Sequence, residues 1–159
     1  MPMLCLDIPP DDPINIEHVI LDFNGTIATD GQLIAGVVER IVQLSSQVTV
    51  HVITADTNAS ARSQLHDVPC TLKIIGANQQ DRAKLEYTQS LGINTVLAAG
   101  NGRNDGLLLQ EAALGICVIQ REGASFSSMQ AADLVCVHIN DALDLLLRPH
   151  RLKATLRNG

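Results

Sequence analysis

The stretch Val19-Ile20-Leu21-Asp22-Phe23-Asn24-Gly25-Thr26 joins an apolar run to a carboxylate and then to a turn rich in glycine and threonine. An apolar run of this kind is typical of a strand buried on both faces of a parallel sheet. Because ligands of open α/β sheets bind beyond the carboxyl ends of such strands, we expect Asp22 to point into a crevice. Backbone N–H groups of the turn can surround an anion, so the stretch predicts a carboxylate that faces a phosphorus atom. The alternative is that Asn24-Gly25 is only a turn and Asp22 a solvated strand end.

Segments of strand and helix character alternate along the rest of the chain. Besides the strand that ends at Asp22, the apolar pattern predicts strands over residues 4–8, 14–17, 48–53, 71–75, 95–99, 116–119 and 134–137. Helical spacing predicts helices over residues 34–44, 59–65, 81–91, 105–114, 125–132 and 142–147. This alternation indicates an α/β fold of three layers, Rossmann-like, with a mainly parallel sheet, helices on both faces and a short N-terminal β-hairpin.

Length and composition restrict both the organisation and the partners of the chain. A length of 159 residues with 46% hydrophobic content predicts a single domain, with the hairpin in residues 1–17, a core in residues 18–149 and a tail in residues 150–159. The net charge of −6 and the 2% aromatic content argue against a nucleic-acid partner. No apolar stretch reaches the length of a membrane span, and the four cysteines form no close pairs, so we expect no membrane partner and a cytoplasmic location.

Three further groups of polar residues follow predicted strands or lie on predicted helices. Thr54, followed by Ala55, ends an apolar strand with a hydroxyl that can donate to a phosphate; the alternative is a simple helix cap. Lys84 supplies a cation in a helical stretch, although a solvated surface lysine would give the same pattern. The glycine-rich turn over residues 100–106 follows a strand and carries an acid that can approach a cation, but its spacing differs from that of a dinucleotide fingerprint. The strands that precede Asp22, Thr54 and the glycine-rich turn predict that all three loops meet in one crevice.

In this order, the residues resemble the motifs of the haloacid dehalogenase (HAD) superfamily, in particular its small soluble proteins that are similar to the phosphorylation domain of P-type ATPases. The resemblance runs from about Ile16 to Pro149. The first motif matches Asp22-Phe23-Asn24-Gly25-Thr26, the second Thr54, the third Lys84, and the fourth Gly100-Asn101-Gly102-Arg103-Asn104-Asp105.

The resemblance implies a role for each matching residue. Asp22 would attack phosphorus and become an aspartyl phosphate, with Asn24, Thr54 and Lys84 as its catalytic partners. A Mg²⁺ ion would bind Asp22, the main-chain carbonyl of Asn24 and the fourth-motif loop, in which Asn101 and Asp105 are the candidate ligands. The substrate would contact six residues: Phe23, Asn24, Thr54, Ala55, Lys84 and Asn104.

Two departures from the family pattern predict weak catalysis. Asn24 stands where hydrolytic members carry the acid that protonates the leaving alcohol, which an amide cannot do. Asn101 stands where the metal ordinarily meets a carboxylate, and a neutral oxygen binds Mg²⁺ less strongly. We therefore expect a slow Mg²⁺-dependent phosphoryl-transfer enzyme that prefers acyl or aryl phosphates, with Asp30 or Asp56 as candidates for a displaced acid. The alternative is a degenerate domain that binds phosphate or a phosphorylated partner; a receiver-like domain is a weaker third interpretation.

The intervals between the four motifs are filled by predicted core elements, which leaves no room for a cap domain of about 50 residues. An open crevice predicts that a phosphorylated small molecule or macromolecule enters it. By the resemblance, capless members are oligomers, so we expect a homo-oligomer in which the hairpin or the tail contacts a neighbouring subunit; the alternative for the tail is a frayed helix.

Overall fold

The computed structural model describes residues 3–55 and 59–159. Its centre is a six-stranded sheet in which every neighbouring pair of strands is parallel. The strands follow the order β10-β9-β8-β3-β6-β7. Their bounds are β3 His18–Asp22, β6 Thr49–Thr54, β7 Thr71–Ile74, β8 Val96–Gly100, β9 Leu114–Val118 and β10 Leu134–Cys136. This arrangement confirms the predicted α/β fold with a mainly parallel sheet.

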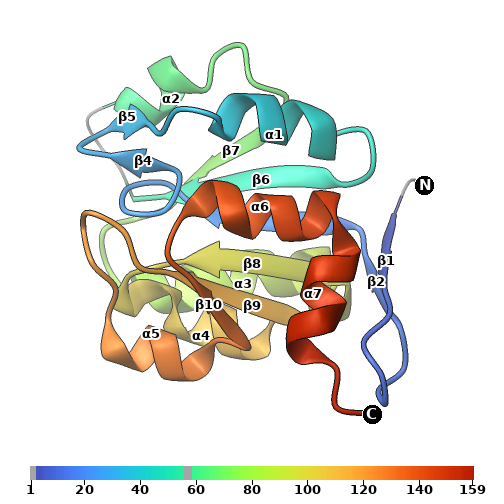
Figure 1. Cartoon of the computed structure of the whole chain (residues 1–159). Helices are drawn as coiled ribbons and strands as arrows, with labels where there is room; N and C mark the ends of the chain where they lie inside the picture. Colours follow the sequence, from blue (N-terminus) through green and yellow to red (C-terminus); the bar gives the residue numbers. More distant parts are fainter. Residues whose placement is uncertain (1–2, 56–58) are drawn as a thin grey trace.

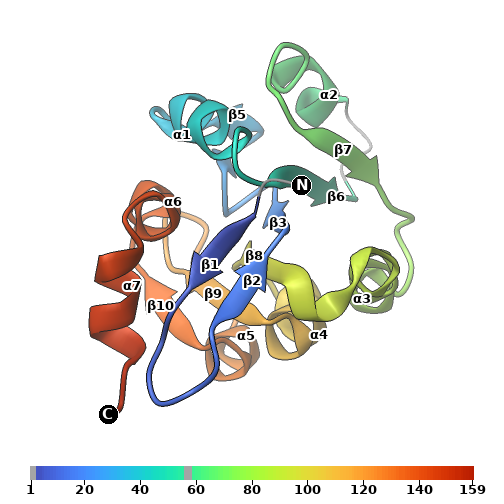
Figure 2. The ribbon, with the colours of Figure 1, turned by 90° about the vertical axis from the view of Figure 1, so that its right-hand side faces the viewer.

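Helices cover both faces of the sheet and complete the three layers, as Figure 2 shows with several helices seen end-on. Helices α1 (Val37–Leu44) and α6 (Ile139–Leu147) contact each other on one face. Helices α3 (Gln80–Leu91), α4 (Gly106–Glu111) and α5 (Phe126–Ala131) lie together on the other face. Each face encloses its own apolar cluster, one including Leu21 and the other including Ile20, because successive side chains of a strand point to opposite faces.

The chain reverses its direction across the sheet at β3. From β3 it passes through α1 to β6 and then through α2 (Ser60–Gln64) to β7; it returns through α3 to β8 on the other side of β3. The register places Asp22 opposite Ile53 of β6 and Leu21 opposite Ala99 of β8, so Thr54 and Gly100 each lie one step further along. Such a reversal leaves a crevice at the carboxyl ends of the strands, and Asp22 lies in the middle of it.

The N-terminal hairpin and the C-terminal segment pack against each other at the opposite end of the sheet (Figure 1). Strands β1 (Leu4–Leu6) and β2 (Ile14–Ile16) are antiparallel, as predicted. The tail is a regular helix, α7 (Pro149–Leu156), whose Leu152 side chain is completely buried. The alternative of a frayed helix is therefore wrong, because Pro149 begins a new helix just after α6 ends and the apolar side of α7 packs within the same chain.

Several boundaries and one hairpin differ from the predictions. Helix α1 begins at Val37 because Gly36 has a positive φ of 92°, and α6 begins at Ile139 because the His138 side chain caps it. Helix α4 ends at Glu111, so that β9 starts earlier than predicted. The short hairpin of β4 (Ala28–Thr29) and β5 (Gln32–Leu33), unpredicted from sequence, lies on the side of the molecule where the strands of the central sheet end (Figure 1).

Two short 3-10 helices complete the described elements, η1 (Ile93–Thr95) and η2 (Arg103–Asp105). Among the described residues, the helices are all too short or too polar to span a bilayer.

Candidate active site

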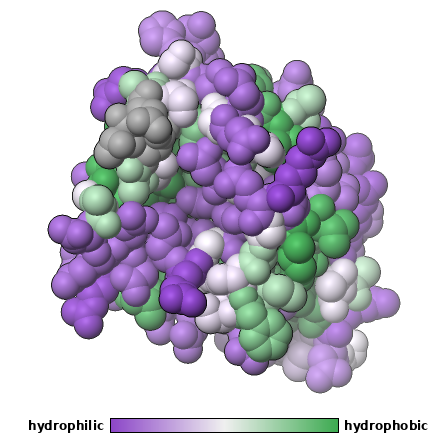
Figure 3. Space-filling model, turned by 90° about the vertical axis from the view of Figure 1, so that its left-hand side faces the viewer, coloured by the Kyte–Doolittle hydropathy of each residue, from purple (hydrophilic) through white to green (hydrophobic). Residues whose placement is uncertain are grey.

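A polar pocket of about 310 Å³ opens at the carboxyl ends of β3, β6 and β8. Figure 3 shows this face of the molecule, with hydrophilic residues across most of it and hydrophobic residues in separate smaller patches. The pocket is lined by Asp22, Asn24, Thr54, Ala55, Gln80, Lys84, Asn101, Gly102 and Asn104. The structure thus brings together residues from all four predicted motifs.

Two of the predicted site residues do not line this pocket. The Phe23 side chain is completely buried and belongs to the apolar cluster on one face of the sheet. Asp105 is likewise inaccessible, with 0% of its surface exposed. Phe23 contributes to the site through its backbone instead, since its carbonyl accepts hydrogen bonds from the N–H groups of Thr26, Ile27 and Ala28 at 3.2, 3.0 and 3.0 Å.

The turn that follows Asp22 packs closely against the fourth-motif loop. Gly25 has a positive φ of 84°, and a Cβ atom there would overlap the Asn101 side chain, so this position requires glycine. The Thr26 hydroxyl lies 3.1 Å from Asp22 Oδ2 and 3.2 Å from Asn101 Oδ1. A hydroxyl has one proton, so two acceptors compete for it and one of them keeps free acceptor capacity.

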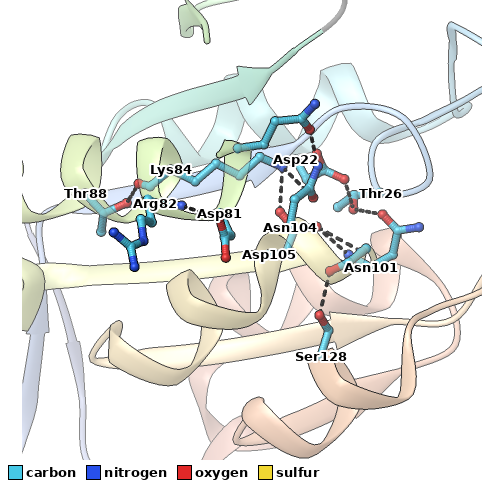
Figure 4. A network of polar contacts seen from close by, with 12 residues as sticks. Asp22, Thr26, Asp81, Arg82, Lys84, Thr88, Asn101, Asn104, Asp105 and Ser128 are labelled. Carbon is cyan, nitrogen blue, oxygen red and sulfur yellow. Dashed lines mark hydrogen bonds and ion pairs between the residues drawn. The ribbon is translucent and has the colours of Figure 1, made fainter. Parts of the chain in front are cut away.

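Lys84 reaches from α3 into the centre of the site, as Figure 4 shows. Its Nζ atom donates to Asp22 Oδ1 at 2.8 Å, to Asp105 Oδ1 at 2.7 Å and to Asn104 Oδ1 at 3.1 Å. Only 1% of Lys84 is exposed, and these three bonds use all of its ammonium protons. Lys84 is therefore a buried cation shared by two carboxylates, which rules out the alternative of a solvated surface lysine.

The charges of this cluster shift the protonation of its members. Burial, and then the nearby charge of Asp105, raise the pKa of Asp22 to about 7 against the opposing effect of Lys84. Burial alone would lower the pKa of Lys84, but Asp22 and Asp105 outweigh it and hold that pKa above its usual value. The three side chains carry a net charge of −1 when both acids are ionised. A cation bound beside Asp22 would therefore favour its ionised form.

Asp105 organises the fourth-motif loop and is not among the residues that line the pocket. Its Oδ2 atom accepts the backbone N–H groups of Asn101 and Gly102, both at 3.0 Å, while Oδ1 is held by Lys84. Both carboxylate oxygens are thus occupied within the protein. The structure supports Asp105 as a residue that orients Lys84 and this loop, rather than as a direct metal ligand.

Asn101 is held by two neighbouring segments and presents its amide oxygen to the site. Its Nδ2 atom donates to the carbonyl of Gly123 at 3.0 Å, which assigns the orientation of the amide and leaves Oδ1 toward Thr26 and Asp22. Asn101 Oδ1 and Asp22 Oδ2 are therefore two oxygens that approach the same hydroxyl.

The Asn24 side chain is exposed and accepts the backbone N–H of Gly31 at 3.1 Å, which connects it to the β4–β5 hairpin. Asp30, one candidate for a displaced acid, lies in that hairpin and is not among the residues that line the pocket. Its backbone N–H donates to Glu122 at 3.3 Å. Asp56, the other candidate, falls outside the described residues.

The oxygen donors of the site fit Mg²⁺ with a low ligand charge. Mg²⁺ binds through one or two carboxylates together with neutral oxygens, waters and substrate phosphate. Asp22 and Asn101 offer such oxygens, with acceptor capacity that the single Thr26 proton leaves unfilled. The described residues contain no cluster of three or more carboxylate, histidine or cysteine side chains able to hold a metal. The set thus fits a metal held weakly by the protein and more strongly once phosphate is present.

Gln80 is a pocket residue that the sequence reasoning missed. It lies one helical turn before Lys84, and its Oε1 atom accepts the Asn104 amide at 2.6 Å. The spacing of four residues places both side chains on one face of α3, which was the available signal. Gln80, Gly102 and Asn104 also line an adjoining hollow of about 480 Å³ with Ala77, Gln79, Asp81 and Arg103. The site therefore has room for more than a phosphate group.

Comparison with protein-family models finds no match to this sequence. Two proteins of Methanocaldococcus jannaschii, both described as uncharacterized, are similar in sequence. MJ0073 is 57% identical over 63 residues, which cover 40% of this chain and 68% of MJ0073. MJ0072 is 45% identical over 40 residues, which cover 25% of this chain and 91% of MJ0072.

Solved structures share the fold over almost the whole chain. The cobalt-bound deoxy-D-mannose-octulosonate 8-phosphate phosphatase of Haemophilus influenzae superposes with a TM-score of 0.70 at 15% identity, covering 90% of this chain and 94% of that one. The 3-deoxy-D-manno-octulosonate 8-phosphate phosphatase of Moraxella catarrhalis, in complex with a magnesium ion, a phosphate ion and a KDO molecule, gives a TM-score of 0.66 at 18% identity, covering 88% of this chain and 90% of that one. A Streptomyces avermitilis protein provisionally assigned to the HAD hydrolases gives a TM-score of 0.67 at 22% identity, covering 95% of this chain and 91% of that one. At these identities the likeness establishes the HAD fold.

Proposed function

We infer that this chain, which belongs to the same family as the archaeal protein MJ0073 and has the fold of the HAD hydrolases, is a phosphoryl-transfer enzyme with Asp22 as its nucleophile. One observation carries the proposal: the buried Lys84 ammonium binds Asp22 Oδ1 at 2.8 Å at the floor of the pocket. A lysine in this position holds one carboxylate oxygen and can also attract a phosphate group. The hydrolase class of the structural neighbours supports the same conclusion.

The chemical step follows from the groups present. An oxygen of Asp22 would form a bond to phosphorus while the bond between phosphorus and the leaving-group oxygen breaks, and that oxygen would depart with the bonding electrons. Bound Mg²⁺ would supply charge neutralisation between the phosphate and Asp22. Thr54 would contribute its hydroxyl to the phosphate, and Lys84 its positive charge. Water would then cleave the aspartyl phosphate and release inorganic phosphate.

The amide of Asn24 determines which substrates this step suits. It has no acidic proton for a departing alkoxide and no basic site to activate water, and losing a general acid or base lowers a rate by about 10²–10⁴. Acyl and aryl phosphates need no proton on the leaving oxygen, because the groups that leave are stable anions. We therefore propose a slow enzyme that favours such phosphates, from a small molecule or a macromolecule.

A substrate panel tests this proposal. Acetyl phosphate, p-nitrophenyl phosphate and a hexose phosphate would be compared with and without Mg²⁺, for the wild type and for Asp22→Asn. The expected order is acetyl phosphate first and the hexose phosphate last, with all activity lost in the variant. Equal activity of Asp22→Asn, or a preference for the hexose phosphate, would contradict it.

The low ligand charge of the site also favours a second candidate, a domain that binds phosphate or a phosphorylated partner without turnover. Among the described residues that line the pocket, Asp22 is the only carboxylate that a metal would meet. Titration calorimetry with inorganic phosphate separates the two functions. Phosphate binding that is indifferent to Mg²⁺ supports the binding domain, and binding that requires Mg²⁺ supports the enzyme.

A further inference from the structure

The loop between β9 and α5, residues 119–125, contacts two of the four motifs of the candidate active site and the neighbouring hairpin, although no motif of the sequence includes it. The Gln120 side chain binds the turn after Asp22, and the Gly123 carbonyl accepts the Asn101 amide. The backbone N–H of Ser125 donates to the Asn101 carbonyl at 2.8 Å. Glu122 accepts the backbone N–H of Asp30 in the β4–β5 hairpin. The loop thus joins the turn, the fourth-motif loop and the hairpin.

Gln120 makes the connection that bears most directly on Asp22. Its Nε2 atom donates to the carbonyl of Thr26 at 2.9 Å and to that of Gly25 at 3.2 Å. Its Oε1 atom accepts the backbone N–H of Ile139, the first residue of α6, at 2.8 Å. Because one end faces an N–H group and the other faces two carbonyls, the amide has a single satisfactory orientation. Gln120 therefore ties the turn to the start of a nine-residue helix.

The two carbonyls that Gln120 holds set the planes of two consecutive peptide groups. Those planes include the N–H groups of Thr26 and Ile27, which both donate to the Phe23 carbonyl. They also flank the Cα of Thr26, whose hydroxyl contacts Asp22 Oδ2 and Asn101 Oδ1. A rotation of either peptide group would move that hydroxyl, and with it the carboxylate and amide oxygens of the site.

We propose that Gln120 is a positioning residue for Asp22, which acts through the turn at Gly25 and Thr26. The kinetic consequence of this inference rests on the proposed phosphoryl-transfer function. Its structural consequence, an ordered turn, rests on the hydrogen bonds alone. A displacement of about 1 Å at a reacting group lowers a rate by as much as about 10²-fold. The competing explanation is that Gln120 only caps α6.

The variant Gln120→Glu separates these two roles. A glutamate can still accept the N–H of Ile139, and its negative charge is favourable at a helix N-terminus. It has no donor for the carbonyls of Gly25 and Thr26 and would place a carboxylate oxygen against them. A residue that only caps α6 would tolerate this change, whereas a residue that holds the turn would not.

Gln120→Met removes both connections, and Gln64→Met is its matched control. The Gln64 side chain of α2 accepts the backbone N–H of Leu33 in the hairpin at 3.1 Å, and within the described part of the chain no hydrogen bond joins it to the turn or to Asp22. The first readout is the rate at which acetyl phosphate with Mg²⁺ phosphorylates Asp22, followed by intact mass over a range of acetyl phosphate concentrations. The second readout is amide hydrogen exchange of the peptide spanning residues 22–28 in the absence of substrate.

We expect Gln120→Glu and Gln120→Met to lower the maximal phosphorylation rate about 10- to 100-fold. Hydrogen exchange of residues 22–28 should become faster in both, while Gln64→Met should match the wild type in both readouts. A wild-type rate in Gln120→Glu would overturn the proposal, and so would unchanged exchange at the turn. Faster exchange at the turn together with an unphosphorylated wild-type protein would support the positioning of the turn and contradict the proposed function instead.

Discussion

Asn24 is the residue whose replacement should raise the activity most. It occupies the place of a general acid, and its exposed side chain is held by the N–H of Gly31 at the edge of the pocket. Asn24→Asp keeps the size of the side chain and adds a carboxyl group that can donate a proton to the leaving oxygen and later accept one from water. We expect hexose phosphate hydrolysis to rise by about 10²–10⁴ and acetyl phosphate hydrolysis to rise less.

The matched control for this gain is Asn15→Asp, which adds the same charge at an exposed position of the N-terminal hairpin. Intact mass should first show that the wild-type sample is free of deamidation, because hydrolysis of the Asn24 amide would create the same acid. Equal rates for Asn24→Asp and Asn15→Asp would show that the missing proton donor does not limit turnover.

Lys84 should matter to stability as much as to chemistry. Replacing it with methionine leaves Asp22 and Asp105 close together without their shared cation, and breaking a buried ion pair in this way costs about 3–5 kcal/mol. Because the pKa of Asp22 is raised to about 7, Asp22 carries a proton at pH 5 and depends less on Lys84 there. Urea unfolding of metal-free Lys84→Met should therefore show a larger loss at pH 8 than at pH 5, and equal losses would contradict the shared-cation arrangement.

At this scale the sequence predicted which side chains meet but not how they are arranged. Asp22, Thr54, Lys84 and Asn101 stand out because each follows a strand or carries a charge at a motif position. Both carboxylate oxygens of Asp105 accept hydrogen bonds, from Lys84 and from two backbone N–H groups. These bonds depend on the geometry of the loop, which the spacing of residues in the sequence does not determine. Gln120 escaped notice for the same reason, since its partners are backbone carbonyls far away in the sequence.

A buried polar chain connects two central strands to the helix that carries Lys84. His51 of β6 is only 4% exposed; its ring nitrogens lie 3.0 Å from His18 Nδ1 of β3 and 2.8 Å from the Tyr87 hydroxyl of α3. Burial, and then the charge of His18, lower the pKa of His51 to about 4. The unfolded chain therefore binds a proton at His51 between about pH 6.5 and pH 4 that the folded protein does not bind.

It follows that this histidine makes the fold sensitive to acid. Neutral His51 contributes about 2–3 kcal/mol at most to the free energy of unfolding. This contribution is fully present above pH 6.5 and is lost as the pH falls through about 4. Free energies of unfolding measured from pH 8 to pH 4 should fall less steeply in His51→Gln than in the wild type. Parallel curves for the two proteins would mean that His51 is protonated equally in both states.

The C-terminal helix α7 should stabilise the fold without affecting the chemistry. Leu152 is completely buried, so Leu152→Ala should lower the free energy of unfolding by about 2–5 kcal/mol. Lys153→Ala removes an exposed ion pair with Asp7 and should cost at most about 1 kcal/mol. Acetyl phosphate turnover of the folded variants should equal that of the wild type, because α7 lies at the end of the sheet opposite the pocket (Figure 1). A stability of Leu152→Ala close to that of Lys153→Ala would contradict the packing of α7.

Elements with a strong apolar period were predictable, and elements held by single contacts were not. The strands of the parallel sheet are mainly apolar, with polar interruptions at His51 in β6 and Lys73 in β7, which explains why their predicted positions agree with the structure to within a few residues. Strands β4 and β5 have two residues each, too few for a period, and side chains of Asn24 and Gln64 bind their backbone. Helix α7 was not predicted, because a proline such as Pro149 is typical both of the end of one helix and of the beginning of the next.

The arrangement of the whole molecule was predictable where topology dictates it. Alternating strands and helices require a parallel sheet, and a parallel sheet brings the loops after β3, β6 and β8 to one edge, where the pocket lies. Assembly into a homo-oligomer stays a prediction, because the structure holds one chain. Sedimentation equilibrium at several protein concentrations checks it, and a constant monomer mass would count against an oligomer that covers the pocket.

The proposed function depends above all on Asp22 as the residue that receives the phosphoryl group. The most direct measurement is the intact mass of the protein after brief exposure to acetyl phosphate and Mg²⁺ and an acid quench, with proteolysis to locate the adduct. We predict the added mass of one phosphoryl group on the peptide that contains Asp22, lost on treatment with hydroxylamine and missing from Asp22→Asn. An unmodified wild-type protein, or an adduct of the same amount in Asp22→Asn, would contradict the central claim.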